Sequence, residues 1–171
     1  MLVLKSYQDC YLHLPRDDNL ASSRFSIYAP AGVEDSNVNG DGLGTVGLGD
    51  DWNASNGSQI NSNSEEVELF FAHLRASGLV PGGGYDTTCP TNAYGGQISI
   101  QDGALAIAGH VTIFGQLEEP IAKILESRLD DGLSASGRMQ ADFTSEVMGA
   151  STVSSITSYK DTSRYNIAFR L

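Results

Sequence analysis

The segment from residue 35 to residue 42 carries oxygen-bearing side chains at alternating positions, and glycines within it permit a sharp turn. A hard cation such as Ca²⁺ needs several oxygen ligands that converge on a small sphere, and alternation in a tight loop supplies them. The pattern is typical of the first half of a calcium-binding loop. It predicts a calcium site formed by Asp35, Asn37, Asn39 and Asp41.

A second interpretation of this loop stays open. The twelfth position, where a helix-loop-helix calcium hand needs a bidentate glutamate, is Val46, so that hand is not present. Asp50 and Asp51 are available to complete the shell from further along the chain. The alternative is a solvated Asn/Gly turn that holds no ion. The sequence therefore predicts no required cofactor, with calcium as the candidate ion.

A pair of carboxylates, Asp130 and Asp131, precedes Gly132 near the end of a predicted helix. Negative charge at a helix C-terminus opposes the helix dipole, at a cost of about 0.3–1 kcal/mol for each group. This unfavourable interaction is expected to be offset by Arg128, by Arg138, by backbone amides of the following turn, or by a cation. The alternative is a solvated turn that begins at Asp130.

The types of residue that commonly perform catalysis are scattered. His13, His73 and His110 lie far apart and belong to no HxxxH or HxH array, and no GxSxG elbow is present. The glycines at 82–84 and 95–96 do not lead into a helix with a Lys-Ser/Thr pair, so turns are predicted there and not phosphate cradles. We predict no catalytic residues and no enzymatic activity.

The two cysteines, Cys10 and Cys89, permit one disulfide bond. Closing so long a loop would restrict the unfolded chain by about 3–5 kcal/mol in the entropy model. The alternative is two unrelated buried thiols. The CxxC spacing of a metal site is absent.

The chain has 171 residues, 10 of them basic and 21 acidic, which gives a net charge of -11. An acidic surface repels phosphate backbones, so the charge excludes nucleic-acid binding through a broad basic face. The 40% apolar share supports a folded core, and no run of 18 apolar residues is present to form a membrane span.

The expected elements begin with a helix from residue 2 to residue 14, because Leu4, Tyr7, Tyr11 and Leu14 share one helical face. Pro15 ends it. No capping residue introduces this helix, so we interpret it as the end of a longer one. Residues 16–64 are rich in Asn, Gly and Ser and form a loop region.

A second helix is expected after the capping box of Ser62 and Glu65, with an apolar stripe and a left-handed terminator at Gly78. Alternating residues between 97 and 114 predict two strands, with a hairpin turn at Asp102-Gly103. A short helix should begin near Pro120 and bury its isoleucines and leucine at 121, 124 and 125. Strands are expected over 138–143 and at the C-terminus. The order predicts an α+β fold.

Five segments, in their order along the chain, resemble the type IV pilin-like family, which comprises minor pilins and type II secretion pseudopilins. The family segments are "YLALPGD", "GDGxG", "E…HLxxAGL" and "DDGxxxxG". The matching residues are Tyr11–Asp17, Asn39–Gly44, Glu66–Val80, Tyr94–Gly96 and Leu129–Gly132, the last followed by Ser136-Gly137. Arg16 and Ser77 depart from the family pattern, and the apolar N-terminal helix is not in this chain.

The resemblance implies one pilin-like globular domain over 1–171. In it, residues 1–15 are the remnant of an N-terminal amphipathic helix packed on an antiparallel β-sheet through Leu4, Tyr7 and Tyr11. Residues 16–64 form long polar loops, and residues 65–171 form a helix and antiparallel strands.

The resemblance also implies a non-catalytic subunit of a type IV pilus or type II secretion pseudopilus. Its partners would be other subunits of the filament and the inner-membrane assembly machinery. Its location would be extracytoplasmic, membrane-anchored before assembly and then in a periplasmic or cell-surface filament. The alternative is an adhesive minor pilin whose loop over 31–63 recognises a surface, glycan or secreted partner, with Trp52 either an aromatic anchor or a core residue.

Overall fold

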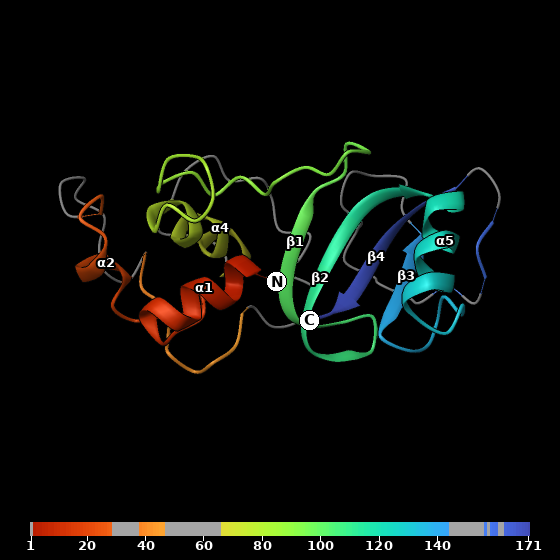
Figure 1. Ribbon diagram of the computed structural model, residues 1–171, viewed down its shortest axis with the longest axis horizontal. Coiled ribbons are helices and arrows are strands. Elements are labelled where there is room, and N and C mark those ends of the chain that lie inside the picture. The colour runs from red at the N-terminus through yellow and green to blue at the C-terminus, as the bar shows by residue number, and fades with distance from the viewer. Residues whose placement is uncertain (1, 29–37, 47–65, 144–155, 157, 161–162) are drawn as a thin grey trace. The chain divides into compact units, whose positions relative to one another are not determined.

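Figure 1 shows the computed structural model, which describes residues 2–28, 38–46, 66–143, 156, 158–160 and 163–171. The chain divides into two compact units, which we describe separately. The described residues up to Cys89 belong to unit 1, and those from Pro90 to Leu171 belong to unit 2.

Unit 1 begins with helix α1 (Leu2–Tyr11), followed by the short helix α2 (Ala21–Arg24). The predicted first helix is confirmed but ends one turn early, because Leu12 adopts a left-handed conformation with a φ of 60°. Tyr7 is fully buried, and its ring packs on the rings of Tyr11 and Phe25. The apolar face of α1 therefore has partners inside unit 1.

Helix α4 (Glu66–Ala76) of unit 1 confirms the helix predicted from the apolar stripe. Phe70, Phe71 and Leu74 are buried, and Gly78 has the left-handed conformation expected of a terminator. The predicted capping residues Ser62 and Glu65 lie outside the described residues.

Arg75 of α4 holds the loop that follows this helix. Its guanidinium group donates hydrogen bonds to the carbonyl oxygens of Asp86 and Thr88, at 2.5 and 2.6 Å. A Cβ atom at Gly82 would lie 2.7 Å from the Arg75 side chain. The buried arginine thus fixes the backbone over residues 82–88.

Unit 2 is built on a four-stranded antiparallel sheet in the order β1-β2-β4-β3. The strands are β1 (Ile98–Ala104), β2 (Ile107–Glu118), β3 (Met139–Phe143) and β4 (Arg164–Arg170). The last two confirm the strands predicted over 138–143 and at the C-terminus. The C-terminal strand β4 lies between β2 and β3, so β3 is joined to the rest of the sheet only through the last strand of the chain.

The hairpin between β1 and β2 turns at a different place from the one predicted. Asp102 and Gly103 lie within β1, where the register shifts by a bulge. The turn is made by Leu105 and Ala106, whose φ angles are 50° and 65°. Two-residue hairpin turns favour positive φ because it matches the strand twist, and here non-glycine residues adopt it.

Helix α5 (Glu119–Leu129) packs against β2 and β4 and lies over the sheet in Figure 1. Pro120 stands in its first turn, as predicted. The predicted inward face was wrong in part, because Ile124 is half exposed while Ala122 and Glu126 are buried. The face of α5 that contacts the sheet is therefore rotated about the helix axis relative to the predicted face of residues 121, 124 and 125.

Apolar residues of the sheet form two buried clusters. One joins Leu117, Met139, Ala141, Tyr165 and Ile167 to Ala122 of α5. The other contains Val111, Ile113 and Ala168 together with residues of the β1–β2 hairpin. Tyr165 and Ile167 thus belong to one cluster and the adjacent Ala168 to the other, because successive side chains of a strand point to opposite faces.

The turn at Tyr94-Gly95-Gly96 lies on a bulge of β2. The Asn92 side-chain amide donates to the Gly115 carbonyl oxygen at 2.7 Å, and the Gly115 amide donates to the carbonyl oxygen of Gln97 at 2.9 Å. A Cβ atom at Gly96 would lie 1.9 Å from the Gly115 oxygen. Only glycine permits this approach of two backbones.

The helices and the antiparallel sheet make the fold α+β. No helix among the described residues is long and apolar enough to cross a bilayer. The packing of the first helix on the sheet and the single domain over 1–171 concern both units together, and they stay predictions.

Candidate functional site

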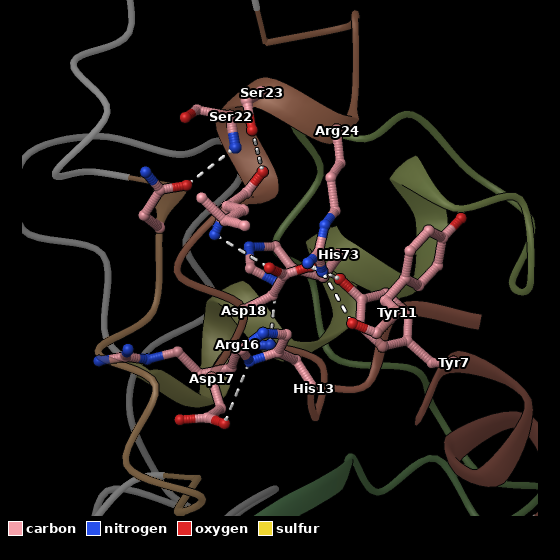
Figure 2. A network of polar contacts seen from close by, with 12 residues as sticks. Tyr7, Tyr11, His13, Arg16, Asp17, Asp18, Ser22, Ser23, Arg24 and His73 are labelled. Carbon is pink, nitrogen blue, oxygen red and sulfur yellow. Dashed lines mark hydrogen bonds and ion pairs between the residues drawn. The ribbon is translucent and has the colours of Figure 1, made fainter. Parts of the chain in front are cut away.

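A network of polar contacts in unit 1 joins three segments that are distant in the sequence (Figure 2). These segments are residues 13–18, the loop at residues 38–44 and helix α4. The centres of the network are the carboxylate of Asp18 and the imidazole of His73, both fully buried.

Asp18 accepts three hydrogen bonds. The donors are the Tyr7 hydroxyl group at 3.0 Å, the Arg24 guanidinium group at 2.7 Å and the Leu20 amide at 3.0 Å. Burial and the neighbouring Asp18 charge raise the pKa of Tyr7, so its hydroxyl group stays a donor. The buried charge is therefore paired with a cation and fully hydrogen-bonded, as a buried carboxylate requires.

Both ring nitrogens of His73 bind backbone groups. The Arg16 amide donates to Nδ1 at 2.9 Å, and Nε2 donates to the carbonyl oxygen of Val38 at 2.7 Å. Only the neutral imidazole can accept at one nitrogen while donating from the other. Burial lowers the pKa of His73 to about 4, which keeps that form at neutral pH.

The loop at residues 38–44 is held against residues 16–18 by backbone contacts. The Gly40 amide donates to the Asp18 carbonyl oxygen at 2.9 Å, and the Gly44 amide donates to the Asp17 carboxylate at 2.8 Å. A Cβ atom at Gly40 would lie 1.9 Å from the Arg16 carbonyl oxygen. Glycine is therefore required where the two segments touch.

The structure describes two of the four predicted calcium ligands. Asp35 and Asn37 lie outside the described residues. Asn39 accepts the Ser22 amide at 2.8 Å, and the exposed Asp41 accepts the Leu43 amide at 3.1 Å. The Asn39 side chain thus joins the loop to α2 and the Asp41 side chain stabilises a local turn, and the calcium site over 35–41 stays a prediction.

The remaining histidines are partly exposed and each faces a carboxylate. His13 Nδ1 lies 4.0 Å from Asp17 Oδ2, and His110 Nδ1 lies 3.3 Å from Asp102 Oδ1. Of the cysteines, Cys10 is exposed on α1 and Cys89 is buried. Their pairing stays a prediction.

A second polar cluster lies in unit 2, where Glu126, Asp130 and Asp131 meet at the C-terminal end of α5. Asp130 accepts the Met139 amide at 2.7 Å. Asp131 accepts the Leu133 amide and the Ser136 hydroxyl group, each at 2.8 Å. These contacts confirm backbone amides as one of the predicted compensations for the acidic pair.

The loop that carries this acidic pair also covers an edge of the sheet. The Met139 amide binds Asp130, and the Ala141 amide donates to the Ser134 carbonyl oxygen at 2.9 Å. These outward amides of β3 would otherwise be available for pairing with another chain.

Several residues of the two clusters escaped the sequence analysis. Arg24 and Asp18 lie in the segment predicted as loop, and no predicted motif contains Glu126. The signal available for Glu126 was a carboxylate four residues before another one, Asp130, which places both on one helical face.

Comparisons of the chain with protein-family models, with curated proteins and with solved structures return no match.

Proposed function

We propose that this protein is a non-catalytic structural subunit of a type IV pilin-like filament, in a pilus or a type II secretion pseudopilus. The proposal rests on the resemblance of the ordered segments and on one structural observation. Residues of three of those segments contact one another in unit 1: His73 binds the Arg16 amide, and the loop at residues 38–44 rests on Arg16 and Asp17.

The contacts of this network support a scaffolding role for the residues that carry the resemblance. The His73 ring accepts the Arg16 amide, Gly40 abuts the Arg16 carbonyl oxygen, and the Gly44 amide donates to the Asp17 carboxylate. A motif whose residues hold one another in place is expected in a building block.

The chemistry of the network also favours a non-catalytic role. A general base needs a nitrogen or oxygen within reach of a substrate. Both nitrogens of His73 are engaged with backbone, and Asp18 has no exposed surface. Neither group can meet a substrate without rearrangement of unit 1.

In this proposal the partners are other filament subunits and the inner-membrane assembly machinery, and the location is extracytoplasmic. The acidic surface makes nucleic acid an unfavourable partner. The adhesive alternative places recognition in the loop over 31–63. Most of that loop, including Trp52, lies outside the described residues, so no contact in the structure favours it.

The test uses antibodies raised against this chain on cells that carry its gene. We expect the antigen in the membrane fraction and in sheared surface filaments, with chemical cross-links to other filament subunits. A cytoplasmic enzyme of the same cells is the fractionation control. Recovery of the antigen solely with that control would refute the proposal.

A further inference from the structure

We propose that Glu126, Asp130 and Asp131 bind one calcium ion at the C-terminal end of α5. Each residue offers a carboxylate oxygen, and these atoms lie within 4.8 Å of one another. Calcium holds oxygens at about 2.3–2.6 Å, so two of its ligands can stand about 5 Å apart. The three carboxylates therefore stand within the span of one ion.

The side chain that points to an ion is Glu126. It is 1% exposed, and neither of its carboxylate oxygens has a hydrogen-bond partner among the described residues. The Tyr159 hydroxyl group is a polar neighbour that acts to lower the pKa of Glu126, but the pair does not meet the distance and angle criteria of a hydrogen bond. A buried carboxylate without partners is costly, and a bound cation would remove that cost.

The donors around the cluster are already used by the other two carboxylates. The Met139 amide binds Asp130, whereas the Leu133 amide and the Ser136 hydroxyl group bind Asp131. Each of these oxygens keeps a second lone pair for a metal. Glu126 receives none of these donors, so the cluster lacks positive charge at its buried end.

The cationic side chains of the described residues form no ion pair with this cluster. The Arg138 guanidinium group stacks on the Phe169 ring, 5.3 Å from its centroid. A cation, one of the compensations that the sequence suggested for the acidic pair, would also neutralise Glu126.

The ligand set indicates the class of ion. Three carboxylates without nitrogen or sulfur suit a hard cation. Calcium fits better than magnesium, because the shorter magnesium–oxygen distance of about 2.0–2.1 Å would require the carboxylates to draw together. Asp131 is exposed, so water can complete the shell. The ion would tie the end of α5 to the loop that covers β3.

A proton is the competing partner of Glu126. Burial and the charges of Asp130 and Asp131 raise the pKa of Glu126 to about 7. The experiment is therefore made at pH 8, where calcium does not compete with that proton.

The test titrates the full chain with CaCl₂ after treatment with EDTA and follows the heat of binding and the melting temperature. We expect one equivalent of calcium to bind and to raise the melting temperature. E126Q should weaken binding at least about tenfold, because a charged ligand is lost. D131N, whose side chain can still accept the Leu133 amide, should weaken it as well.

D9N is the matched control, because it removes an exposed carboxylate of α1 and leaves both the end of α5 and the loop at residues 35–41 intact. Its affinity for calcium should equal that of the unaltered chain. In EDTA, E126Q should melt at a higher temperature than the unaltered chain, which shows that the variant folds. Absence of binding, full affinity in E126Q and D131N, or an equal loss in D9N would each overturn the proposal.

Discussion

The hydroxyl group of Tyr7 donates a 3.0 Å hydrogen bond to the carboxylate of Asp18, and both residues are fully buried. The contact joins helix α1 to the segment that follows it. Since Asp18 also binds Arg24, one carboxylate links α1, α2 and the turn between them.

Removal of this hydroxyl group should destabilise the protein. Y7F leaves the ring packing intact but deprives the buried Asp18 of a donor, and hydrogen bonds to charged groups contribute about 1.5–3 kcal/mol. We expect the free energy of unfolding to fall by about that amount in urea denaturation. Y11F is the control, because the Tyr11 hydroxyl group makes no hydrogen bond with the described residues, and it should change the value by less than about 0.5 kcal/mol. Equal losses in the two variants would contradict the assignment.

The buried His73 should make stability depend on pH. Its pKa is 6.5 in the unfolded chain and about 4 in the folded one. Between these values the unfolded state binds more protons, so the free energy of unfolding decreases as the pH falls. The decrease should approach about 3 kcal/mol near pH 4. Urea denaturation at several pH values between 4 and 7 measures it.

The matched variant for this pH effect is H73Q, which cannot titrate. Glu126 acts in the opposite direction, because its pKa rises from 4.5 to about 7 and its contribution is lost as the pH increases. The comparison is therefore made between E126Q and the double variant E126Q/H73Q. The double variant should show the shallower dependence on pH, and identical slopes would refute the role of His73.

The contact at Gly40 should not tolerate a methyl group. G40A would place a Cβ atom 1.9 Å from the Arg16 carbonyl oxygen, so one of the two segments must move. At Gly44 the φ angle is 83° but no atom lies within 4 Å of a Cβ, so G44A carries backbone strain alone, about 1–2 kcal/mol. We expect G40A to lower the unfolding midpoint in urea more than G44A. The reverse order would show that the loop does not rest on residues 16–18.

The hairpin turn offers a stabilising substitution. Ala106 is exposed and has a φ of 65°, so A106G should relieve strain and raise the free energy of unfolding by up to about 1 kcal/mol. A108G, at an exposed position of strand β2, should instead lower it by about 0.5–1 kcal/mol. Thermal denaturation of both variants measures the opposite signs, and equal shifts would contradict the turn at Leu105-Ala106.

The amino-acid sequence by itself determined the elements whose pattern is local. The apolar stripe before Gly78 predicted α4, and alternation at the C-terminus predicted β4, because helical and strand periodicities are properties of neighbouring residues. The glycine turn at residues 94–96 was also visible, since a turn depends on the residues that form it.

The tertiary structure decided which polar groups meet. The hairpin turned at Leu105-Ala106 because the bulge at Gly103 carried the pairing past the expected turn. Asp18 accepts hydrogen bonds from Tyr7 and Arg24. His73 is hydrogen-bonded to the backbone of Arg16 and Val38. Glu126 is buried beside Asp130. Such pairings depend on burial and on contacts between distant segments, and no local pattern in the sequence encodes either.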